Sequence, residues 1–200
     1  MGEVGISRRR LVGAVAVGAA GVLLGPGAVF ANGGDERDDV DLLRWDLVQI
    51  VQGVVLAGGT DIGRDAASGD TVSLTGSGDA RPGKHKATGG GTFVHKHAKG
   101  SEVAHGVYVV TGFKSFVNAG GSLVGTGLTD GIDELKNTTG GVLSLNVRLM
   151  PASGGSANGV LEVHCELPGS RPVTEGIRLS VLTFNFVQNS GATLFHILQD

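Results

Sequence analysis

Two stretches of strictly alternating polarity constrain the fold of this chain more than any other feature of its sequence. Residues 142–149 and residues 160–167 each place an apolar side chain at every second position. A period of two is the period of a β-strand, in which successive side chains point to opposite faces of the sheet. The apolar positions are Leu143, Leu145, Val147 and Leu149 in the first stretch, and Leu161, Val163, Cys165 and Leu167 in the second. We therefore predict two adjacent antiparallel strands, each with one buried and one solvated face.

The polar positions of the two stretches predict how the strands pair. A hairpin centred on Gly155 sets Arg148 opposite Glu162 and Asn146 opposite His164. Glu162, His164 and Glu166 share the outward face. They either form a carboxylate–imidazole site that binds a metal or performs acid–base chemistry, or belong to a solvated strand of mixed charge. We favour the solvated strand. Cys165 belongs to the apolar face, where burial makes a thiol a small hydrophobic group and raises its pKa.

The remainder of the chain repeats this pattern of short apolar runs separated by turn residues. Strands are predicted near residues 43–50, 53–57, 71–76, 89–97, 103–117, 141–149, 159–167, 175–187 and 192–198. Gly accounts for 36 of the 200 residues without a G-X-Y period, which excludes collagen. Only residues 41–52 and 130–137 have room for a helical turn or two. We predict an all-β fold over residues 42–200, a single antiparallel β-barrel or β-sandwich of about eight to ten strands.

The first 31 residues are predicted to be a signal peptide and not part of this fold. The charged sequence Ser7-Arg8-Arg9 precedes an apolar run at residues 11–24, and small residues lead to a cleavage site at Ala31. The run is too short to cross a bilayer core of about 30 Å. An ordinary Sec signal and an uncleaved anchor are the alternatives, but the segment resembles a twin-arginine signal. That resemblance implies a secreted, extracytoplasmic protein that is exported after folding.

The segment that follows the predicted cleavage site, residues 32–41, is predicted to be a flexible acidic linker and not a calcium site. Loss of residues 1–31, with three arginines and one glutamate, changes the formal net charge from −3 to −5. A mildly acidic domain lacks the basic surface that nucleic-acid binding requires, so we predict no nucleic-acid partner. With a single cysteine, the chain has no internal disulfide, as expected of a protein that folds before export.

Several phrases rich in glycine and threonine resemble a loose group of secreted bacterial β proteins that have no assigned activity. These phrases are Thr75-Gly76-Ser77-Gly78, residues 88–93 and residues 106–112. The resemblance extends over most of the domain and implies the same β class of fold. It implies no catalytic residue.

Histidines cluster in the predicted hairpin at residues 89–109. His95 and His97 are two residues apart on one strand, so both side chains leave the same face. A three-residue turn at Ala98–Gly100, with glycine last, brings His105 to that face as well. Three convergent imidazoles predict a zinc or copper site, and the alternative is that these histidines are solvated residues at the end of a strand.

The sequence contains neither a Gly-x-Ser-x-Gly nucleophile motif nor a phosphate-binding loop. The predicted function is therefore non-enzymatic: an exported β protein that binds a small ligand or a cell-surface polymer, or serves as an interaction module. Residues 80–100 are locally basic, which suits an anionic polymer but also an ordinary solvated loop. A metal-binding protein or metal-dependent enzyme built on the histidine hairpin is one alternative. A barrel-type isomerase or cyclase that uses His95 as acid or base is the other.

Overall fold

The alternating stretches form adjacent antiparallel strands, β10 (Thr138–Pro151) and β11 (Ala157–Cys165), in a computed structural model that describes residues 40–198. The predicted apolar faces are buried, with Leu145 opposite Leu161. The predicted register is wrong by four residues, because Arg148 lies opposite Asn158 and Ser144 lies opposite Glu162. A shift of four leaves every side chain on its own face, so the polarity pattern cannot detect it.

The position of the turn causes this difference in register. The β10–β11 turn begins at Pro151, whose carbonyl accepts a hydrogen bond from the backbone of Gly154. Gly154 and Gly155 both have positive φ angles, 97° and 79°, and they lie after the centre of the turn. Glycine occupies this conformation at little cost, wherever in the loop it is needed. Its presence in the sequence therefore marks the loop without locating its centre.

The described residues form fourteen strands and two short 3-10 helices. Besides β10 and β11, the strands are β1 (Leu42–Val51), β2 (Val54–Ala57), β3 (Asp61–Asp65), β4 (Thr71–Leu74), β5 (Ser77–Arg81), β6 (Lys86–Ala87), β7 (Gly90–Lys96), β8 (Glu102–Gly120), β9 (Thr129–Asp130), β12 (Gly176–Val181), β13 (Phe184–Ser190) and β14 (Ala192–Leu198). The helices are η1 (Pro82–Lys84) and η2 (Leu135–Asn137).

The predicted all-β fold is confirmed, and each of the nine predicted runs overlaps at least one strand. The run at 175–187 divides into two strands at a turn where Leu182 has a φ of 53°. Four short strands, β3, β5, β6 and β9, were not predicted. The signal-peptide positions Arg8, Arg9 and Ala31, and most of the predicted linker 32–41, lie outside the described residues.

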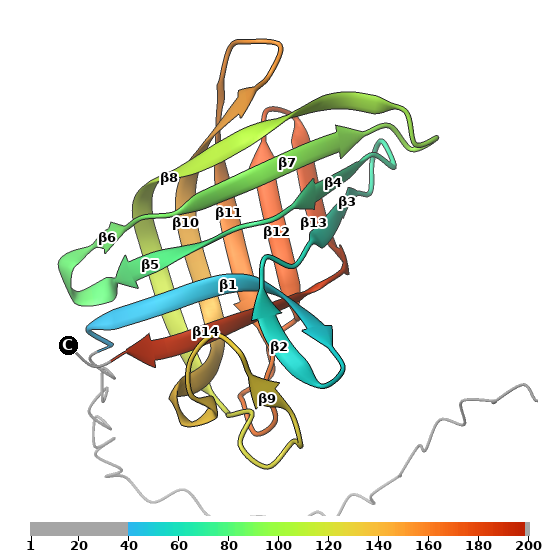
Figure 1. Cartoon of the computed structure of the whole chain (residues 1–200). Coiled ribbons are helices and arrows are strands. Elements are labelled where there is room, and N and C mark those ends of the chain that lie inside the picture. Colours follow the sequence, from blue (N-terminus) through green and yellow to red (C-terminus); the bar gives the residue numbers. More distant parts are fainter. Residues whose placement is uncertain (1–39, 199–200) are drawn as a thin grey trace, which may run out of the picture. The chain divides into compact units, whose positions relative to one another are not determined.

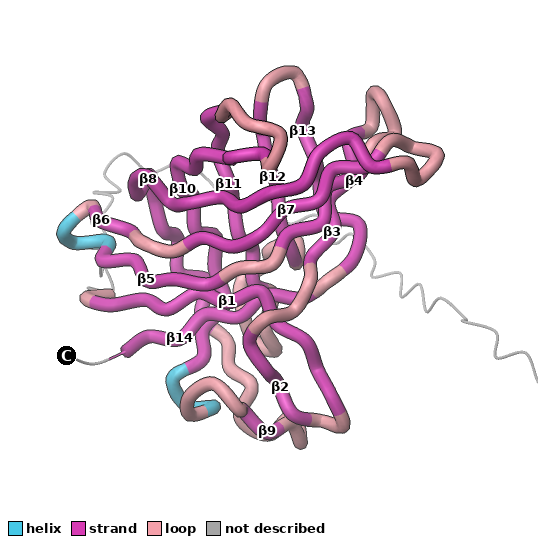
Figure 2. Tube along the Cα trace, turned by 45° about the horizontal axis from the view of Figure 1, so that its top comes forward, coloured by secondary structure: helices cyan, strands magenta, loops and turns pink. Residues whose placement is uncertain are grey.

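The strand pairings close the sheet on itself. Starting at β7, the chain of hydrogen-bonded neighbours passes through β4, β3, β13, β12, β11, β10 and β8 and returns to β7. Figure 1 shows β8 and β7 on one side of this circuit, with β11, β12 and β13 on the other. A second view shows the same arrangement, and β1 runs next to β14 (Figure 2). The barrel, and not the sandwich, is therefore the form that this sheet takes.

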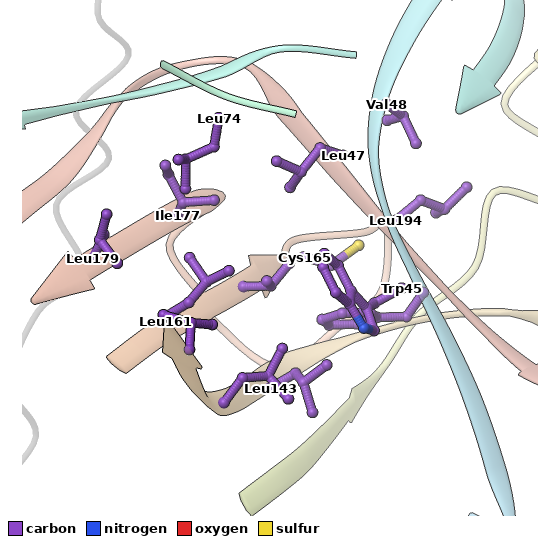
Figure 3. Close-up of a cluster of buried hydrophobic side chains, with 14 of the residues drawn as sticks. Trp45, Leu47, Val48, Leu74, Leu143, Leu161, Cys165, Ile177, Leu179 and Leu194 are labelled. Atoms are coloured by element: carbon purple, nitrogen blue, oxygen red, sulfur yellow. The ribbon is translucent and has the colours of Figure 1, made fainter. Parts of the chain in front are cut away.

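Large apolar side chains fill the interior of the closed sheet. Trp45 is fully enclosed and lies opposite Phe195 of β14. Figure 3 shows Trp45 near Cys165 and Leu143, with Leu161 and Ile177 in the same cluster. Because so many interior positions are apolar and enclosed, the interior is a packed core.

A smaller apolar layer lies on the opposite face of β1 and β14. Val48 and Leu47 leave β1 on opposite sides, as Figure 3 shows, and both are buried. The segment 121–137, which contains β9 and η2, contributes Leu123 to this layer. Strand β9 pairs in parallel with β2, and the two lie side by side in Figure 1. Within residues 40–198, no helix has the length and hydropathy needed to span a membrane.

A buried hydrogen bond fastens the segment 121–137 to β14. His196 Nε2 donates to Asp130 Oδ2 at 2.7 Å, and both side chains are almost fully enclosed. The other oxygen of Asp130 accepts a hydrogen bond from the backbone of Ile132. Thr138 Oγ1 accepts one from the backbone of Leu123. These contacts hold the segment as a fixed wall of the second layer.

Candidate functional site

The second apolar layer contains a pocket of about 150 Å³. Strands β1, β2 and β14 and the segment 121–137 supply most of its wall. The lining residues are Val48, Ile50, Val55, Leu123, Leu128, Glu166, Leu167, Glu175, Ala192, Thr193 and Leu194. A concave apolar site with a few fixed polar groups is the usual form of a small-molecule binding site. This pocket is therefore the candidate site.

Glu175 is the principal polar group in the wall of the pocket. It precedes β12, and its carboxylate accepts hydrogen bonds from the backbone of Glu166 at 2.5 Å and from the backbone of Thr193 at 2.6 Å. The hydroxyl of Thr193 lies 3.1 Å from the same carboxylate, but it donates its single proton at shorter range to the carbonyl of His164, at 2.5 Å. The two amide donors fix the carboxylate in one orientation.

Burial sets the protonation behaviour of Glu175. Removal from water raises the pKa of Glu175 above its ordinary value. The hydrogen bonds from Glu166 and Thr193 partly oppose this rise, whereas the negative charge of Glu166 adds to the rise. A half-buried carboxyl group with a raised pKa, in the wall of an apolar pocket, is typical of functional sites.

The chain geometry next to Glu175 explains how it reaches this position. Gly176 has a φ of 103°, and a Cβ atom there would lie 1.8 Å from the side chain of Gln188. Because Gly176 has no side chain, the side chain of Gln188 can pack directly against the backbone here. The Oε1 atom of Gln188 accepts a hydrogen bond from the amide of Ile177 at 3.1 Å. This contact fixes the start of β12, and with it the position of Glu175.

A second buried acid, Asp61, lies close to Glu175 at the start of β3. Its side chain is fully enclosed, and neither carboxylate oxygen has a hydrogen-bond partner of normal geometry among residues 40–198. Burial raises the pKa of Asp61 to about 7, and the charge of Glu175 contributes to the rise. The Ile62 amide and the Gln188 side chain offset part of the effect. Two acids in poorly hydrated surroundings thus share this end of the fold.

His95 and His97 leave the same face of the chain, as predicted, but they converge on a carboxylate. His95 Nε2 and His97 Nδ1 both donate to Asp70 Oδ2, at 3.0 and 3.2 Å. Burial tends to raise the pKa of Asp70, but the hydrogen bonds from both histidines and from the Ala98 amide outweigh it, so the pKa is lowered. The ring of His95 also lies 4.8 Å from that of Phe184, in an edge-to-face contact. His95 is thus a structural member of the barrel end, and it does not line the pocket.

The structure places His105 on the face opposite His95, which corrects the predicted three-histidine site. The predicted turn does form: the His97 amide donates to Ser101, and Gly100 has a φ of 90°. A β-bulge follows, since Lys96 pairs with Glu102 whereas His95 pairs with Ala104. The bulge reverses the faces of β8 beyond this point. His105 therefore points outward and bonds to Glu102 at 2.6 Å.

The packing of β8 gives the physical reason for the bulge. Tyr108 is almost completely buried, whereas Val107 and Val109 are exposed. With an uninterrupted register after the three-residue turn, the valines would face inward and the tyrosine outward. Burial of the Tyr108 ring in the core stabilises the fold more than burial of Val107 and Val109 would. The extra residue, Val103, forms the bulge that turns Tyr108 inward. Among residues 40–198, no three or more His, Cys, Asp or Glu side chains are grouped so as to hold a metal ion.

The second predicted cluster, Glu162, His164 and Glu166 around β11, does not form one group. His164 Nε2 bonds to Glu162 at 3.1 Å, and Ser144 Oγ donates to the same carboxylate at 3.4 Å. Glu166 instead lines the pocket. Cys165 is buried, and burial raises the pKa of its thiol, as predicted.

The three acids that matter most here, Asp61, Asp70 and Glu175, could not be recognised from the sequence. Each follows a glycine, proline or serine-rich turn, where an acidic residue is ordinarily solvated. The one available signal is that an alternating pattern with Ile177, Leu179 and Val181 at its apolar positions begins two residues after Glu175. Comparisons of this chain with known protein families, curated proteins and solved structures found no match.

Proposed function

We propose that this protein binds a small, largely apolar ligand in the pocket between β1, β2, β14 and the segment 121–137. The observation that carries the proposal is an apolar pocket whose wall holds one oriented carboxyl group, that of Glu175. Burial of apolar ligand surface supplies the binding free energy, and the carboxyl group fixes the orientation of the ligand.

The size of the pocket limits the ligand. A dry cavity of about 150 Å³ accepts a molecule the size of benzene in a well-studied lysozyme variant. The same size class fits the pocket described here, whose volume is about 150 Å³. A ligand with eight non-hydrogen atoms, at roughly 0.5 kcal/mol per atom, binds with a dissociation constant of about 1 mM. A larger natural ligand that extends past Ile50, an exposed side chain in the pocket wall, binds more tightly.

Filling the pocket from one wall tests this proposal. Ala192 lines the pocket on β14 and is only partly buried, so Ala192→Phe places a ring in the cavity without disturbing the barrel interior. Benzyl alcohol is titrated into the protein and followed by NMR chemical shifts. We expect saturable shifts at residues that line the pocket, lost in Ala192→Phe and retained in Ala152→Phe, a control in the exposed β10–β11 turn. Equal binding to all three proteins would refute the proposal.

We also propose that the protein functions outside the cytoplasm. The support is the sequence of the N-terminus, where Arg8 and Arg9 precede a short apolar run and a cleavage site at Ala31. The single, buried cysteine is compatible with this proposal, because a fold that needs no disulfide can form before export.

A further inference from the structure

The charge of the pocket identifies the chemical class of its ligand. Among the eleven described residues that line the pocket, two are charged, and both are acids, Glu166 and Glu175. We propose that the ligand is a cationic amine, an ammonium group on an apolar body, and that Glu175 binds the ammonium group. This inference rests on the proposed function, because it assumes that the pocket binds a ligand.

The hydrogen bonding of Glu175 leaves room for one more donor. An ionised carboxylate offers about four acceptor positions. The amides of Glu166 and Thr193 fill two of them, and the Thr193 hydroxyl, whose proton goes to the carbonyl of His164 at 2.5 Å, lies against a third. An ammonium N–H supplies a further bond, and a hydrogen bond between two charged groups is roughly twice as strong as one between neutral groups.

Asp61 provides an independent reason to expect a positive ligand. Its carboxyl group is fully enclosed, lies within the electrostatic influence of Glu175, and has no hydrogen-bond partner of normal geometry among the described residues. Two acids that share a poorly hydrated region repel each other when both are ionised. A cation held at Glu175 reduces this repulsion, whereas an anionic ligand would increase it.

Two basic side chains near this layer, Arg44 and His196, do not already neutralise the pocket. Arg44 bonds to Asp46 at 2.8 Å, on the same face of β1 as Val48. His196 bonds to Asp130, as described above. Neither Arg44 nor His196 lines the pocket. The charge of Glu166 and Glu175 is therefore available to a ligand.

Three probes with the same ring and different head groups test this inference. Benzylammonium, benzyl alcohol and benzoate are titrated into the full-length protein at pH 7.5 and low salt, with NMR shifts as the readout. We expect benzylammonium to bind about tenfold more tightly than benzyl alcohol, a difference of about 1.4 kcal/mol. Benzoate is expected to bind more weakly than either. If none of the three binds, the proposed function fails. If benzyl alcohol binds as tightly as benzylammonium, the proposed function stands and the inference is refuted.

Two variants test whether the preference for benzylammonium depends on the acids of the pocket. Glu175→Gln keeps the shape of the side chain and is expected to abolish the preference for benzylammonium while benzyl alcohol still binds. Glu166→Gln, at an exposed position, tests the same charge with no buried contact of its side chain at risk, and we expect a loss of several-fold in benzylammonium affinity. Glu102→Gln is the control, because Glu102 pairs with His105 on the remote β7–β8 hairpin. An unchanged preference in both Glu175→Gln and Glu166→Gln would refute the inference, and so would an equal loss in Glu102→Gln.

Discussion

The buried carboxyl group of Asp61 makes the stability of the protein depend on pH in an unusual direction. Its pKa is about 7 in the folded protein, against an ordinary value of 3.8. The folded protein therefore holds this proton more tightly than the unfolded chain does. Between these two pH values, unfolding releases a proton from Asp61, so its contribution to stability is full at low pH and is lost as pH rises through 7.

The magnitude follows from the two pKa values. Each pH unit between 3.8 and about 7 lowers the free energy of unfolding by up to about 1.4 kcal/mol, a total of about 4 kcal/mol. Roughly 3 kcal/mol of this change falls between pH 4.5 and pH 8. Asp61→Asn removes the titrating group and keeps its shape. We expect the variant to gain about 3 kcal/mol relative to the wild-type protein when the pH rises from 4.5 to 8.

Urea unfolding followed by tryptophan fluorescence measures this difference, because Trp45 is the single tryptophan and is buried in the core. The comparison is made between the two proteins at each pH, so that titrating groups common to both cancel. Glu175→Gln is a companion variant that removes a charge adjacent to Asp61, and it is expected to reduce the pH dependence. If Asp61→Asn and the wild-type protein differ by the same amount at pH 4.5 and pH 8, the assignment of a raised pKa to Asp61 is wrong.

Two further predictions concern backbone packing and export. Gly76→Ala should destabilise the fold by about 1–3 kcal/mol, because the new Cβ would lie 2.1 Å from the Tyr108 hydroxyl. Gly83→Ala, which has open space around it, should have little effect in the same thermal or urea unfolding assay, and equal effects at both positions would contradict the packing argument. Replacing Arg8 and Arg9 with lysine should block export, as measured by fractionation of the producing cells, whereas unaffected secretion would indicate the Sec route.

The strands and their faces could be predicted from the sequence because they depend on local pattern. Alternation in residues 142–149 and 160–167 placed Leu145 and Val163 in the core, and the structure confirms this. The same pattern could not determine the register of those strands, because a shift of any even number of residues keeps each side chain on its own face. The true register differs by four residues from the predicted one. Short strands such as β3 and β5 were missed because they contain few apolar residues and form through their neighbours.

The candidate site depended on contacts that no local pattern contains. The turn at Ala98–Gly100 was predicted correctly, but the burial of Tyr108 introduced a bulge and sent His105 to the other face. Asp70 lies 25 residues before His95 in the chain, and their contact exists only because β4 pairs with β7.

The sequence by itself determined the β class of this protein, the faces of its main strands and the burial of Cys165, because these follow from the polarity of neighbouring residues. Tertiary structure decided the closure of the sheet, the bulge, the place of Glu175 in the wall of an apolar pocket, and its electrostatic interaction with the buried Asp61. The physical reason is that the pKa of a carboxyl group depends on the water and charge around it, and these are supplied by strands distant in the sequence. A lone acid after a turn appears solvated until the fold encloses it.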